Sequence, residues 1–148
     1  MTRVHGTAIV LDGGGVLIRG PSGSGKSDLA LRLIDAGALL VADDQTELWP
    51  TERAILMRAP STIVGRLEVR GVGIVQVPSL TEAPLRLVID LVSPEHVERL
   101  PEASSCELLD RSVPRLALAP FEASAVAKVR LALRGLVSSG PGPILAAP

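Results

Sequence analysis

Aromatic residues are almost absent from this chain of 148 residues, which has one tryptophan, one phenylalanine and no tyrosine. Proteins that bind single-stranded nucleic acids stack the bases on aromatic rings and follow the phosphates with positive charge. Here 15 basic residues are balanced by 16 acidic ones, which gives a formal net charge of −1. The composition therefore argues against nucleic acid as the main partner.

Cysteine and long apolar segments are scarce as well. The single cysteine, Cys106, cannot form an internal disulfide, as is typical of reducing compartments, and we interpret it as a structural residue rather than a reactive thiol. No apolar run approaches the roughly 18 residues of a membrane-spanning helix, and the first residues lack the pattern of a secretory signal. We expect a soluble cytoplasmic protein with no membrane contact.

Hydrophobic residues, by contrast, make up 47% of the chain, which is enough for a packed core. The length suits one domain better than two, and we find neither an internal repeat nor a linker. We therefore expect a single domain over residues 1–137. Residues 138–148 are rich in glycine, proline and alanine and are expected to form a flexible tail.

The spacing of apolar residues predicts an α/β fold with a β-rich middle and flanking helices. The first two strands are expected at residues 7–11 and 15–19, joined by a turn, and the first helix at 26–36. Further strands are expected at 38–42, 47–49, 54–57, 67–70, 73–77 and 85–92. The prediction also has a helix or turn at 61–65, a short helix at 94–100, an irregular loop at 101–114 and a final helix at 124–136.

A phosphate-binding loop is the most specific motif in the sequence. The pattern G-x-x-x-x-G-K-[ST] is matched by Gly20, Pro21, Ser22, Gly23, Ser24, Gly25, Lys26 and Ser27. Glycines let the backbone turn so that its N–H groups point at phosphate oxygens, and the following helix adds its positive end. We expect Lys26 to be exposed to the phosphates of ATP and Ser27 to bind Mg²⁺. The motif lies between a predicted strand and a predicted helix, which is the context it requires.

Acidic residues that could complete such a site follow two predicted strands. Asp43 and Asp44 end the strand after the first helix, at the sheet edge where α/β active sites lie. Because neighbouring strand residues point to opposite faces, we expect only one of them to face the nucleotide. A solvated acidic turn is the alternative. Asp90, which ends an apolar strand, is a rival as the metal-binding acid of a Walker B motif.

A third acid, Glu68, lies in the stretch Leu67-Glu-Val-Arg-Gly-Val-Gly-Ile74. Strand alternation places Glu68 and Arg70 on one face, followed by Gly71 and Gly73, which free the backbone. An acid beside a base before two glycines is unusual for a purely structural strand. A surface salt bridge on an edge strand is the alternative interpretation.

Four pieces of the sequence together resemble the catalytic domain of HPr kinase/phosphorylase, the bacterial enzyme that phosphorylates a serine of the phosphocarrier HPr. They are Val4-His5-Gly6, the loop at 20–27, Leu40-Val-Ala-Asp-Asp44 and the stretch 67–74. Their order and spacing are more specific than the loop alone. The resemblance runs from His5 to about Arg99 and more faintly through the last helix. It implies the HPr kinase / phosphoenolpyruvate carboxykinase-like fold.

The resemblance also implies a role for each matching residue. His5 matches a histidine of the family's catalytic site, and Lys26 matches the phosphate-binding lysine. Ser27 and Glu68 match magnesium ligands. Asp44 matches the acid that serves as general base in phosphorylation and as general acid in the reverse reaction; Asp43 would then point to the other face and support the loop.

Several features depart from the family pattern. Arg99 matches a catalytic arginine in a D-R-L-G-like motif, but Glu98 and Pro101 replace the acid and the glycine. The P-G-R-N-like motif tied to dephosphorylation corresponds to Ala119-Pro-Phe-Glu-Ala-Ser124, without arginine or asparagine. The chain resembles the short form that lacks the N-terminal domain of longer members. The resemblance further implies a homo-hexamer.

These observations favour a protein-serine kinase that acts on HPr or an HPr-like phosphocarrier, with or without the reverse phosphorolysis. A small-molecule P-loop kinase and a nucleotide-binding regulator are the alternatives. A metabolite kinase usually has an arginine-bearing lid. Arg111 and Arg115 lie in a loop-like region of the sequence, although nothing marks them as a lid.

Overall fold

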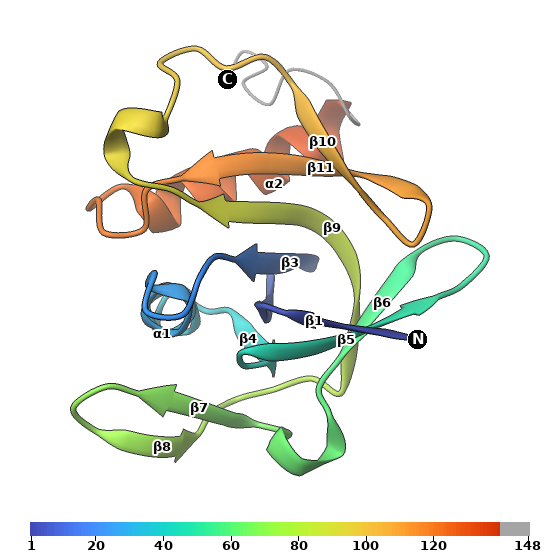
Figure 1. Cartoon of the computed structure of the whole chain (residues 1–148), viewed down its shortest axis with the longest axis vertical. Helices are drawn as coiled ribbons and strands as arrows, with labels where there is room; N and C mark the ends of the chain where they lie inside the picture. Colours follow the sequence, from blue (N-terminus) through green and yellow to red (C-terminus); the bar gives the residue numbers. More distant parts are fainter. Residues whose placement is uncertain (140–148) are drawn as a thin grey trace.

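Eleven strands and two α-helices are formed by residues 1–139, the part of the chain that the computed structural model describes (Figure 1). The strands are β1 (Thr2–His5), β2 (Thr7–Leu11), β3 (Gly14–Arg19), β4 (Leu39–Ala42), β5 (Gln45–Pro50), β6 (Ile55–Arg58), β7 (Arg66–Val69), β8 (Gly73–Gln76), β9 (Glu82–Leu91), β10 (Ser104–Leu108) and β11 (Arg111–Leu118). The helices are α1 (Lys26–Asp35) and α2 (Ala125–Ser139), with short 3₁₀ turns at Ser61–Ile63 and Pro94–His96. None of these helices is long and apolar enough to cross a membrane.

Nine of the strands form one mixed sheet, in the order β1-β5-β6-β9-β3-β2-β4, with β10 and β11 attached through β9. Strand β9 bends and changes its partner along its length (Figure 1). Its first residues pair with β6, and its last residues pair with β11. On its other side β9 runs parallel to β3, which leads directly into the phosphate loop. The strands β7 and β8 form a separate hairpin.

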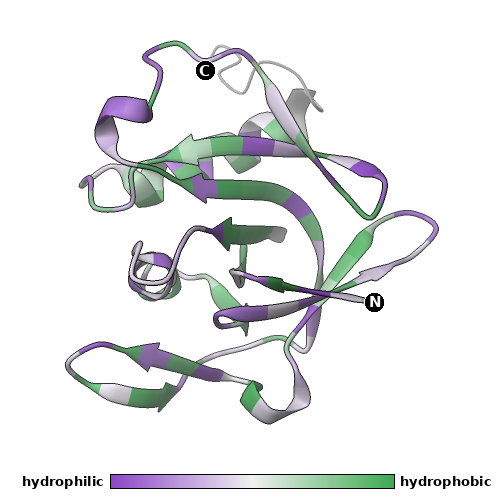
Figure 2. Ribbon diagram, in the orientation of Figure 1, coloured by the Kyte–Doolittle hydropathy of each residue, from purple (hydrophilic) through white to green (hydrophobic). Residues whose placement is uncertain are grey.

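The core has two parts, one on each face of the sheet. Because strand residues alternate, Val16 and Ile18 of β3 pack in one cluster while Leu17 packs in the other. The first cluster also contains apolar residues of both helices, among them Leu29 and Val129. The central strands are accordingly the most hydrophobic part of the sheet (Figure 2). Both helices therefore cover the same face of the sheet. The packing of α1 on this face places its first residues at the sheet edge.

Most of the predicted elements are confirmed, including the first hairpin, helix α1, the strands of the middle region and helix α2. Three expectations are wrong, and one strand, β1, was missed. The short helix at 94–100 is only the 3₁₀ turn Pro94–His96. Helix α2 continues through Ser139, two residues into the expected tail, and the rest of that tail lies outside the described residues.

The expected loop at 101–114 is the third error, since it contains β10 and the first half of β11. Proline has no backbone N–H for the ladder, so Pro114 can lie in a strand only where one side needs no partner. It lies where β11 pairs with β10 alone, before the pairing with β9 begins at Arg115. Arg111 is likewise not part of a lid, because its guanidinium donates hydrogen bonds to the carbonyls of Thr51 and Ala54.

Candidate active site

The carboxyl ends of β3, β4, β9 and β11 meet at one edge of the sheet. Strand β3 runs parallel to β9, and β9 runs parallel to β11. Strand β4 has the same direction as β3, because both are antiparallel to β2. The segments that follow these four strands therefore lie close together, as they do around the ligands of other α/β sheets.

The phosphate loop at residues 20–27 has the backbone shape that its glycines predict. Gly23 and Gly25 have φ values of 81° and 105°, a region that residues with a side chain rarely adopt. Gly20 has no space for a Cβ atom, which would lie 2.5 Å from the hydroxyl of Ser24. No side chain caps the start of helix α1 at Gly25, so its positive end is open to an anion.

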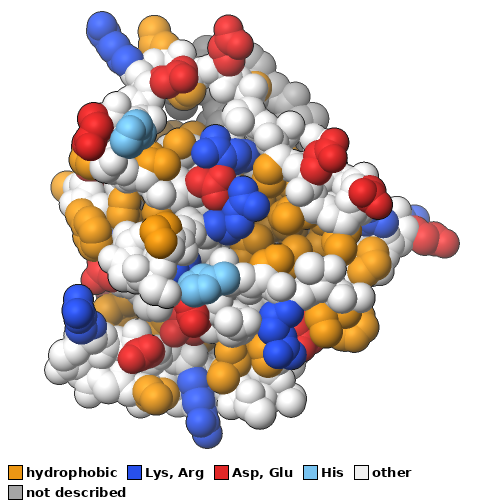
Figure 3. All heavy atoms as spheres, viewed as in Figure 1, with side chains coloured by type: hydrophobic (Ala, Val, Ile, Leu, Met, Phe, Trp, Pro, Cys, Tyr) orange, Lys and Arg blue, Asp and Glu red, His pale blue; other side chains and the backbone are white. Residues whose placement is uncertain are grey.

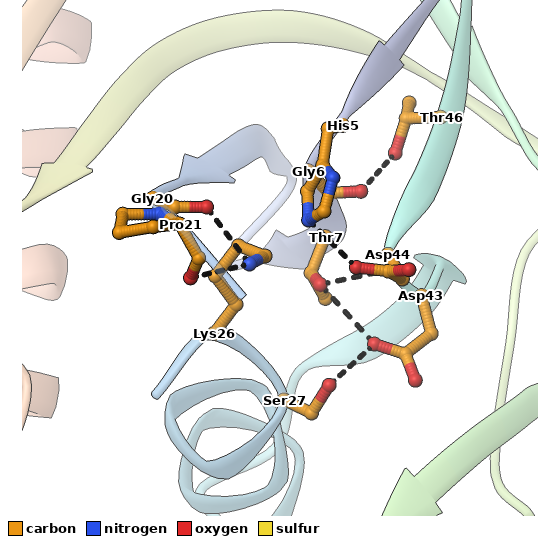
Figure 4. Close-up of polar contacts among 10 residues, drawn as sticks. All are labelled: His5, Gly6, Thr7, Gly20, Pro21, Lys26, Ser27, Asp43, Asp44 and Thr46. Carbon is orange, nitrogen blue, oxygen red and sulfur yellow. Dashed lines mark hydrogen bonds and ion pairs between the residues drawn. The ribbon is translucent and has the colours of Figure 1, made fainter. Parts of the chain in front are cut away.

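Lys26 is shielded from solvent by the loop itself. The residue is only 5% exposed, and its Nζ atom donates hydrogen bonds to the carbonyls of Gly20 (2.9 Å) and Pro21 (3.1 Å). The ammonium group therefore lies inside the curve of the loop (Figure 4). An ammonium group has three N–H donors, so these two bonds leave one for a phosphate oxygen.

Asp43 is the centre of the polar network in this site. Its Oδ1 atom accepts hydrogen bonds from the hydroxyls of Ser27 (2.7 Å) and Thr7 (3.1 Å), and its Oδ2 atom accepts one from the backbone N–H of Glu68 (3.1 Å). The residue is only 8% exposed. Asp43, which the sequence led us to expect only as a support for the loop, is thus the acid that contacts Ser27 directly, and sequence reasoning undervalued it.

Asp44 points toward His5 instead (Figure 4). The Nε2 atom of His5 lies 2.9 Å from Oδ1 of Asp44, and both side chains are accessible, with exposed fractions of 44% and 57%. Asp44 has a φ of 65°, so the chain leaves the extended conformation there. If Nε2 of His5 is protonated and donates a hydrogen bond to Oδ1 of Asp44, then Oδ2 of Asp44 remains free to accept another hydrogen bond.

Hydrogen bonds between two connecting segments of the chain hold His5 and Asp44 in place. The chain passes from β1 to β2 at Gly6, opposite the point where it passes from β4 to β5. There the N–H of Gly6 donates to the carbonyl of Asp44 (2.9 Å), and Thr46 donates to the carbonyl of Gly6 (2.9 Å). The buried hydroxyl of Thr7 accepts the N–H of Asp44 (3.1 Å). The backbone next to His5, where β1 leads into β2, is thus held by hydrogen bonds to the segment that carries Asp44.

Glu68 is brought to the site by the hairpin of β7 and β8. Leu67 is fully buried against helix α1 and the sheet, which anchors the hairpin, and burying a leucine contributes roughly 1.5–3 kcal/mol. The side chain of Glu68 is exposed, and only its backbone is bonded to Asp43. Within residues 1–139 no three His, Cys, Asp or Glu side chains are grouped as a ready metal site.

The donor set nevertheless fits Mg²⁺. The hydroxyl of Ser27 and the carboxylate of Asp43 lie 2.7 Å apart at the start of α1, with Glu68 next along the network. These are oxygen donors, which Mg²⁺ prefers, and the ion usually keeps waters and substrate phosphates as its other ligands. A site with only a few protein oxygens is what such an ion requires.

Asp90, the rival acid, is occupied by two arginines. Its carboxylate accepts bonds from Arg19 (2.8 and 2.9 Å) and from Arg115. Burial opposes ionisation of this carboxyl, but the hydrogen bonds from Arg19 and Arg115 outweigh it and lower the pKa of Asp90. Since Asp90 joins β3, β9 and β11, we interpret it as a structural acid rather than a metal ligand.

This interpretation predicts a loss of stability in Asp90→Asn. Hydrogen bonds to charged groups contribute about 1.5–3 kcal/mol, and we expect a loss of that order in the free energy of unfolding at pH 7. The folded pKa is depressed, so the stabilisation is complete above the unfolded value of about 3.9 and disappears as pH falls through the lower folded pKa. Urea unfolding of both proteins between pH 7 and pH 3 measures this; a difference that does not shrink in acid would contradict it.

Arg99 and Cys106 lie outside the polar network around Asp43. Arg99 is exposed and forms no hydrogen bond or ion pair with any other residue in the described part of the chain. Its role is therefore left to the family resemblance. Cys106 is half-buried near Arg19 and Asp90, and burial raises the pKa of its thiol, which agrees with a structural residue.

The surface around the site carries charges of both signs. Acidic and basic side chains are intermingled on the face shown in Figure 3, and apolar areas lie between them. The face in Figure 3 has no continuous basic stripe of the kind found on nucleic-acid-binding proteins.

Comparisons with known proteins agree on one family. The model of the family described as HPr Serine kinase C-terminal domain matches residues 1–129. The HPr kinase/phosphorylase of Clostridium acetobutylicum is 47% identical over 79 residues, and that of Clostridium tetani is 48% identical over 79 residues. These matches cover 53% of this chain and 26% of each relative, so the chain spans only about a quarter of the curated relatives.

A solved structure is similar over almost the whole chain. The Hpr(Ser) kinase/phosphatase from Coxiella burnetii superposes with a TM-score of 0.78 at 29% sequence identity. The match covers 94% of this chain and 96% of that one. The predicted α/β fold of the HPr kinase type is therefore confirmed.

Proposed function

Because this chain belongs to the HPr serine kinase C-terminal domain family, we propose that it transfers the γ-phosphate of ATP to a serine of HPr or an HPr-like phosphocarrier. The observation that supports this most is the continuous network from Ser27 through Asp43 and Thr7 to Asp44 and His5. It connects the phosphate loop to an accessible carboxylate, and phosphoryl transfer to a hydroxyl group requires both.

The loop residues bind and orient the triphosphate. Backbone N–H groups at the start of α1 point at the phosphates, and the ammonium group of Lys26 supplies a charge within the loop. Mg²⁺ would be held by Ser27 and Glu68, with Asp43 beside them, and it would neutralise charge on the phosphate oxygens. The buried carboxylate of Asp43 keeps the hydroxyl of Ser27 oriented.

Asp44 is the general base in this proposal. It takes the proton of the substrate serine as the serine oxygen forms a bond to the γ-phosphorus and the bond to the ADP oxygen breaks. His5 orients the carboxylate by its contact with Oδ1. In the reverse direction, protonated Asp44 returns the proton to the serine oxygen while inorganic phosphate takes the phosphoryl group and becomes pyrophosphate. Arg99 is proposed as a further catalytic residue on the resemblance alone.

Incubation with HPr and γ-labelled ATP is the direct test of this function. We expect label on a serine of HPr, and none on an HPr variant in which that serine is alanine. Turnover of ATP with no protein substrate would favour a small-molecule kinase. Nucleotide binding with neither transfer nor turnover would favour a regulator and would refute the proposed activity.

The proposed metal site gives a separate prediction for Glu68→Gln. Loss of one carboxylate should raise the Mg²⁺ concentration needed for half-maximal ATP binding by roughly 10–100-fold, in line with the cost of altering groups around bound metals. Isothermal titration at several Mg²⁺ concentrations measures this. Glu52→Gln is the matched control, because Glu52 is exposed in the turn between β5 and β6. An unchanged requirement in Glu68→Gln, with a raised one in Asp90→Asn, would support the Walker B alternative.

A further inference from the structure

We propose that a groove beside the phosphate loop receives the purine base of the bound nucleotide and that the ring of Phe121 is the surface on which the base stacks. This inference rests on the proposed function only in that a nucleotide binds the loop. It is independent of which molecule accepts the phosphate.

The groove has the size and lining of a site for a flat apolar ligand. It is an open cavity of about 460 Å³, within the range of small-molecule pockets. One wall is Pro21 and Ser24 of the phosphate loop. The others are the end of β9 with the segment after it, including Leu91, and the segment after β11, including Pro120. Its walls are therefore mainly apolar, and one of them is the loop that would hold the phosphates.

Phe121 is the only phenylalanine of the chain and is 71% exposed. A single exposed apolar residue needs no explanation by itself, but this ring lies directly against the loop. A Cβ atom added to Gly25 would be 2.8 Å from the Cζ atom of Phe121. Only two residues of this chain are phenylalanine, tyrosine or tryptophan, and one of them, Phe121, is exposed beside the start of α1. Base–aromatic stacking uses such a face.

Hydrogen bonds within the protein hold the walls of the groove in place. Leu118 pairs with Leu91, and its carbonyl accepts the N–H of Val92 (2.9 Å). The guanidinium of Arg32, on helix α1, donates to the carbonyl of Pro120. The turn that carries Phe121 is thus tied both to the sheet and to the helix of the phosphate loop.

The acid of this turn does not place a free charge beside the phosphates. Glu122 lines the groove, but its carboxylate is paired with the ammonium group of Lys128 at 2.8 Å. Ser93, which also lines the groove, has its hydroxyl 2.9 Å from Nδ1 of His96. Glu122 and Ser93 therefore have partners, whereas the buried hydroxyl of Ser24 has none among the described residues. Stacking on Phe121 is accordingly the main means of holding a base.

Calorimetric binding of ATP and of inorganic tripolyphosphate, both with Mg²⁺, tests the proposal. The two ligands share the phosphates, and only ATP carries a base. We expect Phe121→Ala to weaken ATP binding by roughly 5–100-fold, the range found when a stacking ring is removed, and to leave tripolyphosphate binding unchanged. Phe121→Trp, which keeps an aromatic face, should retain ATP binding. Leu131→Ala, at an apolar residue 48% exposed on α2, is the control and should change neither.

Each other outcome decides against the proposal. Equal loss of ATP and tripolyphosphate in Phe121→Ala would show that the ring supports the loop and not the base. No change for ATP would place the base elsewhere. Binding of neither ligand by the unaltered protein would overturn the base site together with the phosphate loop. If the expected pattern is found but HPr is not labelled, the base site stands and only the proposed kinase activity fails.

Discussion

Lys26→Ala is expected to lower phosphoryl transfer to the protein substrate by at least ~100-fold, because a charge-assisted contact that strengthens as charge develops on the transferring group is lost. The structure places the ammonium group of Lys26 inside the loop, bonded to the carbonyls of Gly20 and Pro21. Its remaining N–H donor is the one available to the phosphates. Transfer is measured with labelled ATP under single-turnover conditions.

The burial of Lys26 makes a second variant necessary. Alanine leaves two loop carbonyls without their donor, so part of the effect in Lys26→Ala could come from a changed loop. Lys26→Met keeps most of the side-chain volume and removes only the charge and its donors. Both variants should lose transfer, whereas Arg53→Met, at an exposed residue of the turn between β5 and β6, should keep it. Near-normal transfer in Lys26→Met would refute the role of the loop.

The sequence predicts the centre of the fold well because the signals there are local. Strands β2 and β3 are apolar runs around a glycine turn, and the loop motif fixes where α1 begins. Strand β11 was missed because half of it is held by pairing with β9, about 20 residues earlier in the chain, and β10 was missed with it because β10 pairs only with β11. Pro114 is tolerated because β11 has only one neighbour there. Strand β1 was missed for the same reason, since it pairs with β5 and is itself mostly exposed.

At the site, the sequence predicts which residues take part better than it predicts where their side chains point. Strand alternation indicates that Asp43 and Asp44 point to different sides, and they do. It cannot tell which one faces Ser27, because Asp44 adopts a positive φ and the chain turns at that point. Nor does the sequence show that Thr7 lies between the two acids, a contact made only when β2 packs beside β4.

Asp44→Asn carries the sharpest expected result for the chemistry. A serine hydroxyl is a weak nucleophile until its proton has an acceptor, and general acid–base catalysis typically contributes about 10²–10⁴-fold. We expect a loss of transfer in that range with ATP affinity nearly unchanged. Asparagine is close in shape to aspartate and tolerates the positive φ at this position, so the fold should be kept.

Variants of Asp43 and Asp90 distinguish the general-base role of Asp44 from the alternative roles of these acids. Asp43→Asn should weaken ATP binding in the presence of Mg²⁺, because Asp43 is bonded to Ser27 in the phosphate loop. Asp90→Asn should lower stability and leave transfer near normal where the protein is folded, because Asp90 is occupied by Arg19 and Arg115. Only Asp44→Asn should separate binding from transfer, since its carboxylate is accessible and lies beside His5 rather than at the loop. If Asp90→Asn alone abolished transfer in folded protein, the acid and the architecture proposed for this site would both be wrong.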